Sequence, residues 1–294
     1  MKIFLKAPAR LLPSSYKWLT NCGWLPISFH YFQPIIKRDM LPTTYEDLED
    51  PLYGINLDEN SQLQLLANFQ YNSELEKISL MKKNVLEPYF NNPSFGPGDS
   101  EILYNMVRYF KPKRIIEIGS GESTKFVTLA INRNEKESGI KTEHICIEPY
   151  EQPWLEQFGI KIIRKRVEEL ELSIFTKLSN NDVLFIDSSH VIRTQGDVVY
   201  EYLKILPSLS KGVIIHSHDI FLPRDYPIEW IETRKWFWNE QYLLQALLSN
   251  SPRYKILLTL NYLYRKHKHN LANCCPILKN EGGNPGSFWF KIAE

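Results

Sequence analysis

Short apolar runs alternate with longer amphipathic segments over the last two thirds of the chain. The apolar runs are predicted strands, and the segments between them, which repeat apolar residues at helical spacing, are predicted helices. Continuous apolar strands separated by helices are typical of an α/β domain whose parallel sheet is covered on both faces. The predicted strands are RIIEI, EHICIE, KIIRKRV, DVLFID and GVIIHSHD, and the helices are ESTKFVTLAINR, PWLEQF, RTQGDVVYEYLKIL and KWFWNEQYLLQALLSN.

Two further apolar runs close the chain, RYKILLTLNYLY and GSFWFKI, and the polar segment 265–285 separates them. Because this segment shows no helical pattern, we expect the two runs to form an antiparallel hairpin. The segment contains His267, His269, Cys274 and Cys275, whose spacing matches no common zinc site. We therefore expect a solvated connection there.

The N-terminal third is less regular. Apolar residues at helical spacing between residues 60 and 90 predict two helices or one bent helix, and 29-FHYFQPI-35 is apolar enough to pack on another part of the molecule. The turn cluster NNPSFGPGDS comes before the predicted helix EILYNMVRYF, which Asp99 or Ser100 can cap. We expect an N-terminal extension over residues 1–98 and an α/β domain over residues 99–294.

Composition limits the classes of function. The chain has 294 residues, 43% of them hydrophobic, and a formal net charge of +1, so we expect a packed core and no field that would attract nucleic acid or an acidic membrane. The four cysteines suggest no disulfide framework, and no apolar run reaches the roughly 18 residues that a membrane span needs. These features favour a cytoplasmic protein without a membrane partner, and they leave self-association open.

The first predicted strand ends in Glu117 and the turn Gly119-Ser120-Gly121. In open α/β sheets, ligands bind at the carboxyl ends of the strands, and glycines allow a ligand to approach the backbone. A dinucleotide site would need a third glycine, but Thr124 stands in its place. Glu117, and Glu122 at the start of the next helix, would also repel a pyrophosphate.

The same residues suit an amino-acid ligand that carries a nucleoside. Glu117 would attract an ammonium group, and the hydroxyls of Ser123 and Thr124 would bind a carboxylate. Glu148, at the end of the second strand, would accept hydrogen bonds from two ribose hydroxyls. An amino acid joined to a ribose describes S-adenosylmethionine. The alternative is that Gly119 and Gly121 only form a tight turn.

Three segments, EIGSGESTKF, CIEP and FIDSSH, resemble class I S-adenosylmethionine-dependent methyltransferases, in particular the branch with E-I-G-S-G-x-S-T and a later I-D-x-x-H. The resemblance covers about residues 95–292. It implies a Rossmann-like, seven-stranded, mostly parallel sheet whose last strand is inserted antiparallel. It also implies that Val167 or Glu168, after the third strand, lies near the adenine.

Carboxylate and imidazole groups follow the fourth and fifth predicted strands. In the family's strand order these strands are neighbours, so the groups would converge near the methyl group, where they can hold a divalent ion or act as a base. We expect His216 to point into the sheet packing instead. The other residues of this kind are Asp187, His190, His218 and Asp219.

This region is similar to metal-dependent O-methyltransferases of the catechol type. The resemblance implies that Asp187, His218 and Asp219 hold the ion, and that His190 stands where the family has a lysine base. His218 replaces a carboxylate or amide, which favours Mn, Fe or Zn over Mg. The alternatives are that Asp187 caps the following helix and that His190 is a surface residue at the helix entry.

The acceptor would be bound by additions to the core. Candidates are the aromatic N-terminus and the loop 221-FLPRDYPIEW-230 with KWFWNEQYLL after it, whose tryptophans and polar tips suit a sugar or natural product. We therefore expect an O-methyltransferase for a hydroxyl of a small polar acceptor. The alternatives are an N-methyltransferase and a cofactor-binding scaffold protein without turnover.

Overall fold

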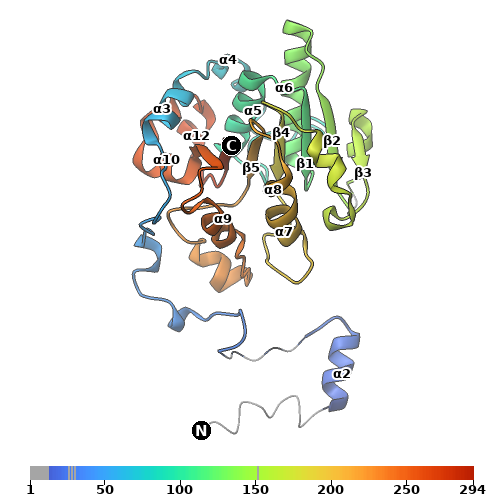
Figure 1. The fold of residues 1–294 in the computed structure, drawn as a ribbon, viewed down its shortest axis with the longest axis vertical. Helices are drawn as coiled ribbons and strands as arrows, with labels where there is room; N and C mark the ends of the chain where they lie inside the picture. Colours follow the sequence, from blue (N-terminus) through green and yellow to red (C-terminus); the bar gives the residue numbers. More distant parts are fainter. Residues whose placement is uncertain (1–12, 26, 28, 30, 151) are drawn as a thin grey trace. The chain divides into compact units, whose positions relative to one another are not determined.

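The computed structural model describes residues 13–25, 27, 29, 31–150 and 152–294. A seven-stranded sheet with the order β3-β2-β1-β4-β5-β7-β6 forms its centre, and β7 is antiparallel to both of its neighbours (Figure 1). This confirms the predicted Rossmann-like fold with an inserted antiparallel last strand. The strands are β1 (Arg114–Ile118), β2 (Glu143–Ile147), β3 (Lys161–Ile163), β4 (Val183–Ile186), β5 (Ile214–Ser217), β6 (Tyr254–Thr259) and β7 (Phe288–Ile292).

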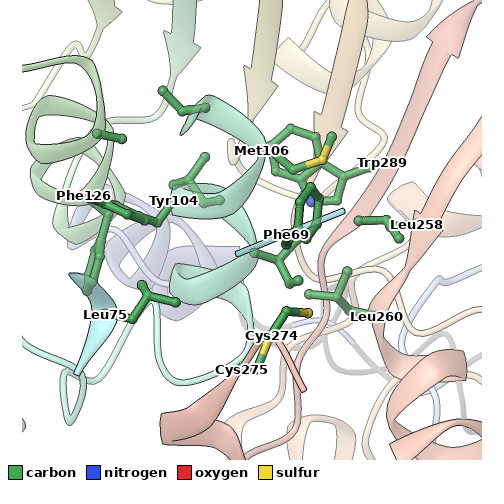
Figure 2. Close-up of a cluster of buried hydrophobic side chains, with 14 of the residues drawn as sticks. Phe69, Leu75, Tyr104, Met106, Phe126, Leu258, Leu260, Cys274, Cys275 and Trp289 are labelled. Atoms are coloured by element: carbon green, nitrogen blue, oxygen red, sulfur yellow. The ribbon is translucent and has the colours of Figure 1, made fainter. Parts of the chain in front are cut away.

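Side chains alternate across the sheet and divide the core into two clusters. On β1, Ile115 belongs to the cluster with α5 and α6, whereas Ile116 and Ile118 belong to the cluster with the helices after β4. Figure 2 shows part of the first cluster, which includes Phe126, Tyr104 and Trp289 together with aliphatic side chains. Both faces of the strands are therefore buried, which explains their continuous apolar sequences.

Helices cover both faces of the sheet. The first face carries α5 and α6, and the second carries α7, the π-helical segment η7, α8 and α9. The α-helices are α2 (Pro13–Asn21), α3 (Glu59–Ala67), α4 (Asn72–Leu75), α5 (Asp99–Phe110), α6 (Glu122–Ser138), α7 (Asp197–Tyr200), α8 (Leu206–Ser208), α9 (Glu240–Leu248), α10 (Leu260–Lys266), α11 (Lys268–Ala272) and α12 (Pro276–Glu281). The short 3₁₀ and π segments are η2 (Arg38–Met40), η3 (Tyr45–Asp47), η4 (Leu155–Phe158), η5 (Val167–Glu169), η6 (Leu172–Lys177), η7 (Glu201–Ile205) and η8 (Trp230–Arg234).

The connection between β6 and β7 is helical, so the expectation of a solvated connection was wrong. It contains α10, α11 and α12, and it contributes Leu271, Cys274 and Cys275 to the first core cluster (Figure 2). His267 is instead near the surface, with its Nε2 at 3.1 Å from a carboxylate oxygen of Glu59. The many charged and amide residues of 265–285 masked the apolar positions, which are spread over three short helices.

The chain divides into two compact units, and the boundary lies at Leu48 and Glu49, not at residue 98. Residues 49–98 belong with the sheet because Leu66, Phe69 and Phe90 are buried in the first core cluster. The smaller unit consists of Met1–Leu48 and Tyr226–Phe237. Sequence reasoning placed the boundary too late, because the helical spacing after residue 60 looked like an independent extension.

The smaller unit joins two segments that are far apart in the sequence. The Tyr45 hydroxyl donates a hydrogen bond to the carbonyl of Tyr226 at 2.9 Å. Arg38 Nε lies 3.2 Å from a carboxylate oxygen of Glu232, and the ring of Trp230 packs near the ring of Trp236. In the part of the chain that the structure describes, no helix is both long and apolar enough to cross a membrane.

A buried glutamate ties α5 to the helical connection. Glu101 is fully buried, and its carboxylate accepts hydrogen bonds from the N–H groups of Gly98, Ile277 and Leu278 at 3.1, 2.7 and 2.9 Å. Burial raises the pKa of Glu101 to about 7, although the three N–H donors act in the opposite direction.

We expect Glu101→Gln to change how stability depends on pH. Because the pKa of Glu101 is higher in the folded than in the unfolded chain, the folded state binds this proton more tightly, and that stabilisation is complete below about pH 4.5. It is lost as the pH rises towards 7, by about 3 kcal/mol in free energy of unfolding. Urea unfolding between pH 4 and 8 should show a smaller decline for Glu101→Gln than for the unchanged chain. Glu76→Gln, at an exposed position, is the control, and equal slopes in all three proteins would contradict this expectation.

Candidate functional site

The turn between β1 and α6 packs directly on the end of β4. Gly119 has a φ of +76°, and a Cβ atom there would lie 1.8 Å from the carbonyl oxygen of Asp187. The N–H of Asp187 donates a hydrogen bond to the carbonyl of Ile118 at 2.9 Å. Only glycine can occupy residue 119, since both the backbone conformation and the missing space exclude a side chain. Gly121 has no such neighbour within 4 Å.

Glu117 lies beneath this turn and is fully buried. Its carboxylate accepts hydrogen bonds from the hydroxyls of Ser123 and Thr124 at 2.5 and 3.0 Å. His144 Nε2 lies 3.0 Å and Cys146 Sγ 3.5 Å from the same carboxylate. We expected Glu117 to meet an ammonium group and the two hydroxyls to bind a carboxylate, but in the structure these groups are bonded to one another. These hydrogen bonds hold the start of α6 against β1 and β2, and the contacts of the three side chains with a ligand stay a prediction.

A cavity of about 230 Å³ opens at the carboxyl ends of β1, β2 and β4. This is the edge at which ligands bind in α/β sheets. Its lining combines apolar side chains, backbone and carboxylates: Ile118, Gly119, Ile147, Glu148, Pro149, Tyr150, Arg166, Val167, Glu168, Asp187, Ser188, Ser189, Arg193 and Asp197.

Glu148 is held at the wall of this cavity by two backbone groups. One carboxylate oxygen accepts the N–H of Ser120 at 3.0 Å, and the other accepts the N–H of Tyr150 at 2.9 Å. A carboxylate oxygen can accept more than one hydrogen bond, so both oxygens can still accept one from a ligand hydroxyl.

At the other end of the cavity, Asp187 joins a cluster of imidazoles and carboxylates. His218 Nδ1 lies 3.5 Å from Asp187 Oδ1 and 3.4 Å from Asp219 Oδ2. One ligand atom from each of these three residues lies within 4.8 Å of the others, so the predicted metal ligands are close together. Among the described residues one other group meets this criterion, that of Glu117, His144 and Cys146.

His190 belongs to the same cluster. Its Nε2 lies 3.2 Å from Asp187 Oδ1 and 3.5 Å from Asp219 Oδ2, and its Nδ1 lies 2.8 Å from Glu240 Oε2. The side chain is buried, so it is not the surface histidine of the alternative interpretation. His216 lies inside the sheet packing, with its ring stacked on Phe185 at 4.2 Å between centroids.

The electrostatics of the cluster follow from this geometry. Burial lowers the pKa of His190, but its hydrogen bonds to Asp187 and Glu240 outweigh burial and raise the pKa above its ordinary value. Burial also opposes the charged form of His218, yet Asp219 and Asp187 raise its pKa. Burial raises the pKa of Asp187, and the two histidines more than compensate, so that it stays low. Asp187 therefore favours its negative form, and His190 and His218 favour their protonated forms.

Sequence reasoning missed one neighbour of this cluster. Asp99 was expected only as a helix cap, but its carboxylate accepts the N–H groups of Gly286 and Ser287 and lies 3.6 Å from His218 Nε2. The ring of Phe95 packs on His218 with centroids 4.9 Å apart. The turn residues before α5 were visible in the sequence. Nothing in them indicated that this segment lies beside the end of β5.

Comparisons with known proteins point to one class of activity. The sequence pattern of a family described as a methyltransferase domain matches residues 116–220. This part of the chain is similar to a methyltransferase domain. The matched residues hold the turn after β1, the cavity wall and the cluster at the ends of β4 and β5.

The individual proteins that resemble this chain have low sequence identity to it. An uncharacterized protein of Archaeoglobus fulgidus is 28% identical over 182 residues, which are 56% of this chain and 80% of that protein. The apo structure of CmcI-N160 is 13% identical and covers 68% of this chain and 72% of its own, with a TM-score of 0.39. The structure of CmcI-N160 with SAH is 12% identical and covers 77% of this chain and 93% of its own, with a TM-score of 0.37.

The predicted cofactor residues fall into two groups. Those that line the cavity are Gly119, Glu148, Val167, Glu168 and Asp187, and those that are not part of its lining are Glu117, Ser120, Gly121, Ser123 and Thr124. The division follows the strand geometry, because the side chain of Glu117 points to the sheet face opposite to that of Ile118. Sequence reasoning also missed Ser188, Ser189, Arg193 and Asp197 of the lining, although the serines directly follow a predicted strand end.

This division predicts different effects for two matched substitutions. Glu148→Ala should weaken S-adenosylmethionine binding by about 1–3 kcal/mol, because a ligand hydroxyl loses a charged acceptor. Glu117→Ala should instead lower the free energy of unfolding by about 1–3 kcal/mol, because it leaves buried donors unsatisfied. Titration calorimetry and urea unfolding of both variants measure these quantities. Unchanged affinity in Glu148→Ala would remove Glu148 from the cofactor site.

Proposed function

We propose that this protein transfers a methyl group from S-adenosylmethionine to a hydroxyl of a small polar acceptor, assisted by a divalent cation. The observation that carries the proposal is the position of Asp187. Its carboxylate lines the cavity and also lies 3.2 Å from His190 Nε2 and 3.5 Å from His218 Nδ1. A cofactor in the cavity would therefore end beside groups that can prepare an acceptor hydroxyl.

The cavity suits the adenosyl part of the cofactor. Glu148 would accept hydrogen bonds from the ribose hydroxyls, and buried Val167 would contact the adenine. The Ser120 hydroxyl is buried and has no hydrogen-bond partner among the described residues, which leaves a donor for a ligand at this turn. When bound, S-adenosylmethionine supplies an activated methyl group on a sulfonium, so the protein mainly has to orient the acceptor and remove its proton.

The cluster suits a divalent cation. Two carboxylates and one imidazole, from Asp187, Asp219 and His218, form a mixed oxygen and nitrogen ligand set that favours Mn, Fe or Zn. The nearby carboxylates of Asp99 and Glu240 add negative charge that stabilises a cation. Such an ion would supply positive charge that lowers the pKa of an acceptor hydroxyl and of His190.

His190 is the proposed base. Its Nε2 edge faces Asp187 and Asp219, the residues beside which the acceptor oxygen would bind. Without added positive charge the pKa of His190 is raised, so the imidazole holds its proton. The role of base therefore depends on positive charge at the two aspartates.

Taken by itself, the smaller unit combines aromatic rings, those of Tyr226, Trp230 and Trp236, with the polar groups of Arg38 and Glu232. Aromatic faces with hydrogen-bonding neighbours suit the apolar faces and hydroxyls of a sugar or a hydroxylated natural product.

Removing metal should abolish turnover and leave cofactor binding largely intact. The test incubates the protein with methyl-labelled S-adenosylmethionine and a panel of hydroxylated and aminated acceptors, with and without EDTA. Asp219→Asn and His218→Ala should each lower the rate roughly 100-fold, because several kcal/mol of charge stabilisation is lost. Added Mn²⁺ or Zn²⁺ should restore the EDTA-treated protein.

The controls separate the alternatives. Glu281→Gln changes an exposed acid on α12 and should leave the rate unchanged. Full activity in EDTA would reduce Asp219 and His218 to structural roles. Labelling of amines alone would indicate an N-methyltransferase, and cofactor binding without labelling of any acceptor would indicate a scaffold protein.

A further inference from the structure

The backbone at His190 has a conformation that needs support. Its φ is +60°, in the left-handed region that residues other than glycine rarely adopt. Its carbonyl oxygen accepts the N–H groups of Asn239 and Glu240 at 3.0 and 3.2 Å. The N–H of Ile192 donates to Asn239 Oδ1 at 2.6 Å. The start of α9 thus holds the loop after β4 by its backbone.

The same short segment holds the imidazole ring. Glu240 Oε2 lies 2.8 Å from His190 Nδ1, and the ring of Trp238 packs against the imidazole with centroids 4.3 Å apart. One edge and one face of the ring are therefore fixed. The remaining nitrogen, Nε2, is directed at Asp187 and Asp219.

Glu240 is itself held in place. The side chain is fully buried, and its second oxygen, Oε1, accepts a hydrogen bond from the Tyr202 hydroxyl at 2.7 Å. That hydroxyl lies 3.0 Å from Ser217 Oγ at the end of β5. Glu240 is also the first residue of α9, where the helix dipole favours a carboxylate. A charge with no access to water is stable here because each oxygen has a donor.

We propose that Glu240 is a positioning residue that orients His190 and keeps a proton on its Nδ1, so that Nε2 is the nitrogen that serves the acceptor. This inference rests on the proposed role of His190 as base. Glu240 does not line the cofactor cavity, so it acts through His190. A carboxylate that holds an imidazole in one tautomer is a recurring arrangement in enzymes, and replacing it lowers the rate by disturbing the orientation of the ring.

Three substitutions at residue 240 separate the effect of side-chain length from the effect of charge. Glu240→Gln keeps the length and can accept from Nδ1, while Tyr202 accepts from the new amide. Glu240→Asp keeps the charge, but it is one methylene shorter and cannot reach Nδ1. Glu240→Ala loses both the length and the charge of the side chain. Glu201→Gln is the matched control, because Glu201 is equally buried on the neighbouring η7 and is bonded to Ser188 at 3.0 Å rather than to His190.

The first readout needs no acceptor. In protein labelled with ¹⁵N at its histidines, the Nδ1-bound proton of His190 should give a slowly exchanging resonance, which His190→Asn identifies by its loss. This resonance should persist in Glu240→Gln and Glu201→Gln. In Glu240→Asp and Glu240→Ala it should disappear or exchange at least about 10-fold faster, because an imidazole N–H without its hydrogen-bond acceptor is less protected from exchange with water.

The second readout is kinetic and uses any acceptor that the panel identifies. Glu240→Asp and Glu240→Ala should lower kcat roughly 10- to 100-fold, with the KM for the acceptor and the cofactor Kd within about 2-fold. Glu240→Gln should stay within about 5-fold of the unchanged protein.

Several outcomes would overturn the proposal. One is an unchanged His190 resonance in Glu240→Asp, which is also informative if Glu240→Ala does not fold. Another is a fall in kcat in Glu201→Gln as large as in Glu240→Asp, which would indicate a general effect of changing a buried acidic side chain. Failure of the unchanged protein to label any acceptor would contradict the proposed function, and the resonance would still test the role of Glu240.

Discussion

The carbonyl oxygen of Asp187 occupies the space that a side chain at residue 119 would need. This contact joins the turn after β1 to the end of β4 without any intervening side chain, and the N–H of Asp187 bonds to Ile118 in the same place. The cavity on one side and the imidazole–carboxylate cluster on the other are both built around this junction. Asp187 belongs to both, because it lines the cavity and its carboxylate lies beside His190 and His218 in the cluster.

Buried charge is the second constraint on the molecule. Glu117, Glu240 and Glu101 are fully buried, and each carboxylate is stabilised by several hydrogen-bond donors. Each one connects separate elements: β1 with α6 and β2, α9 with the loop after β4, and α5 with α12. Since an unpaired buried carboxylate is costly, these groups favour one arrangement of the elements over others. In this protein, buried acidic side chains help to determine how the helices and strands are arranged.

The sequence predicted the sheet well, because strands buried on both faces appear as continuous apolar runs, and the helices between them require parallel pairing. It also predicted that Asp187, His218 and Asp219 lie close together, because neighbouring parallel strands end at the same edge. The face of the sheet to which a side chain points was harder to predict. Glu117 precedes a glycine turn whether it faces the cavity or the core, and only the register of β1 shows that its partners are Ser123 and Thr124.

Long-range contacts through loops could not be predicted. Asp99 approaches His218 because the segment before α5 returns to the end of β5, and no periodicity encodes that path. Glu240 was expected as a polar tip of an acceptor pocket, yet it faces inward because α9 begins beside His190. The helices between β6 and β7 were hidden for another reason, since each is too short for its apolar positions to form a visible period.

The junction between Gly119 and Asp187 also limits how such a protein can diversify. Main-chain atoms set the separation between the two halves of the pocket, so exchange of one amino acid for another cannot lengthen or shorten it. A lineage that takes on larger or smaller substrates would have to do so by remodelling peripheral segments. Loops outside the sheet are where insertions and deletions can accumulate while the central architecture stays constant.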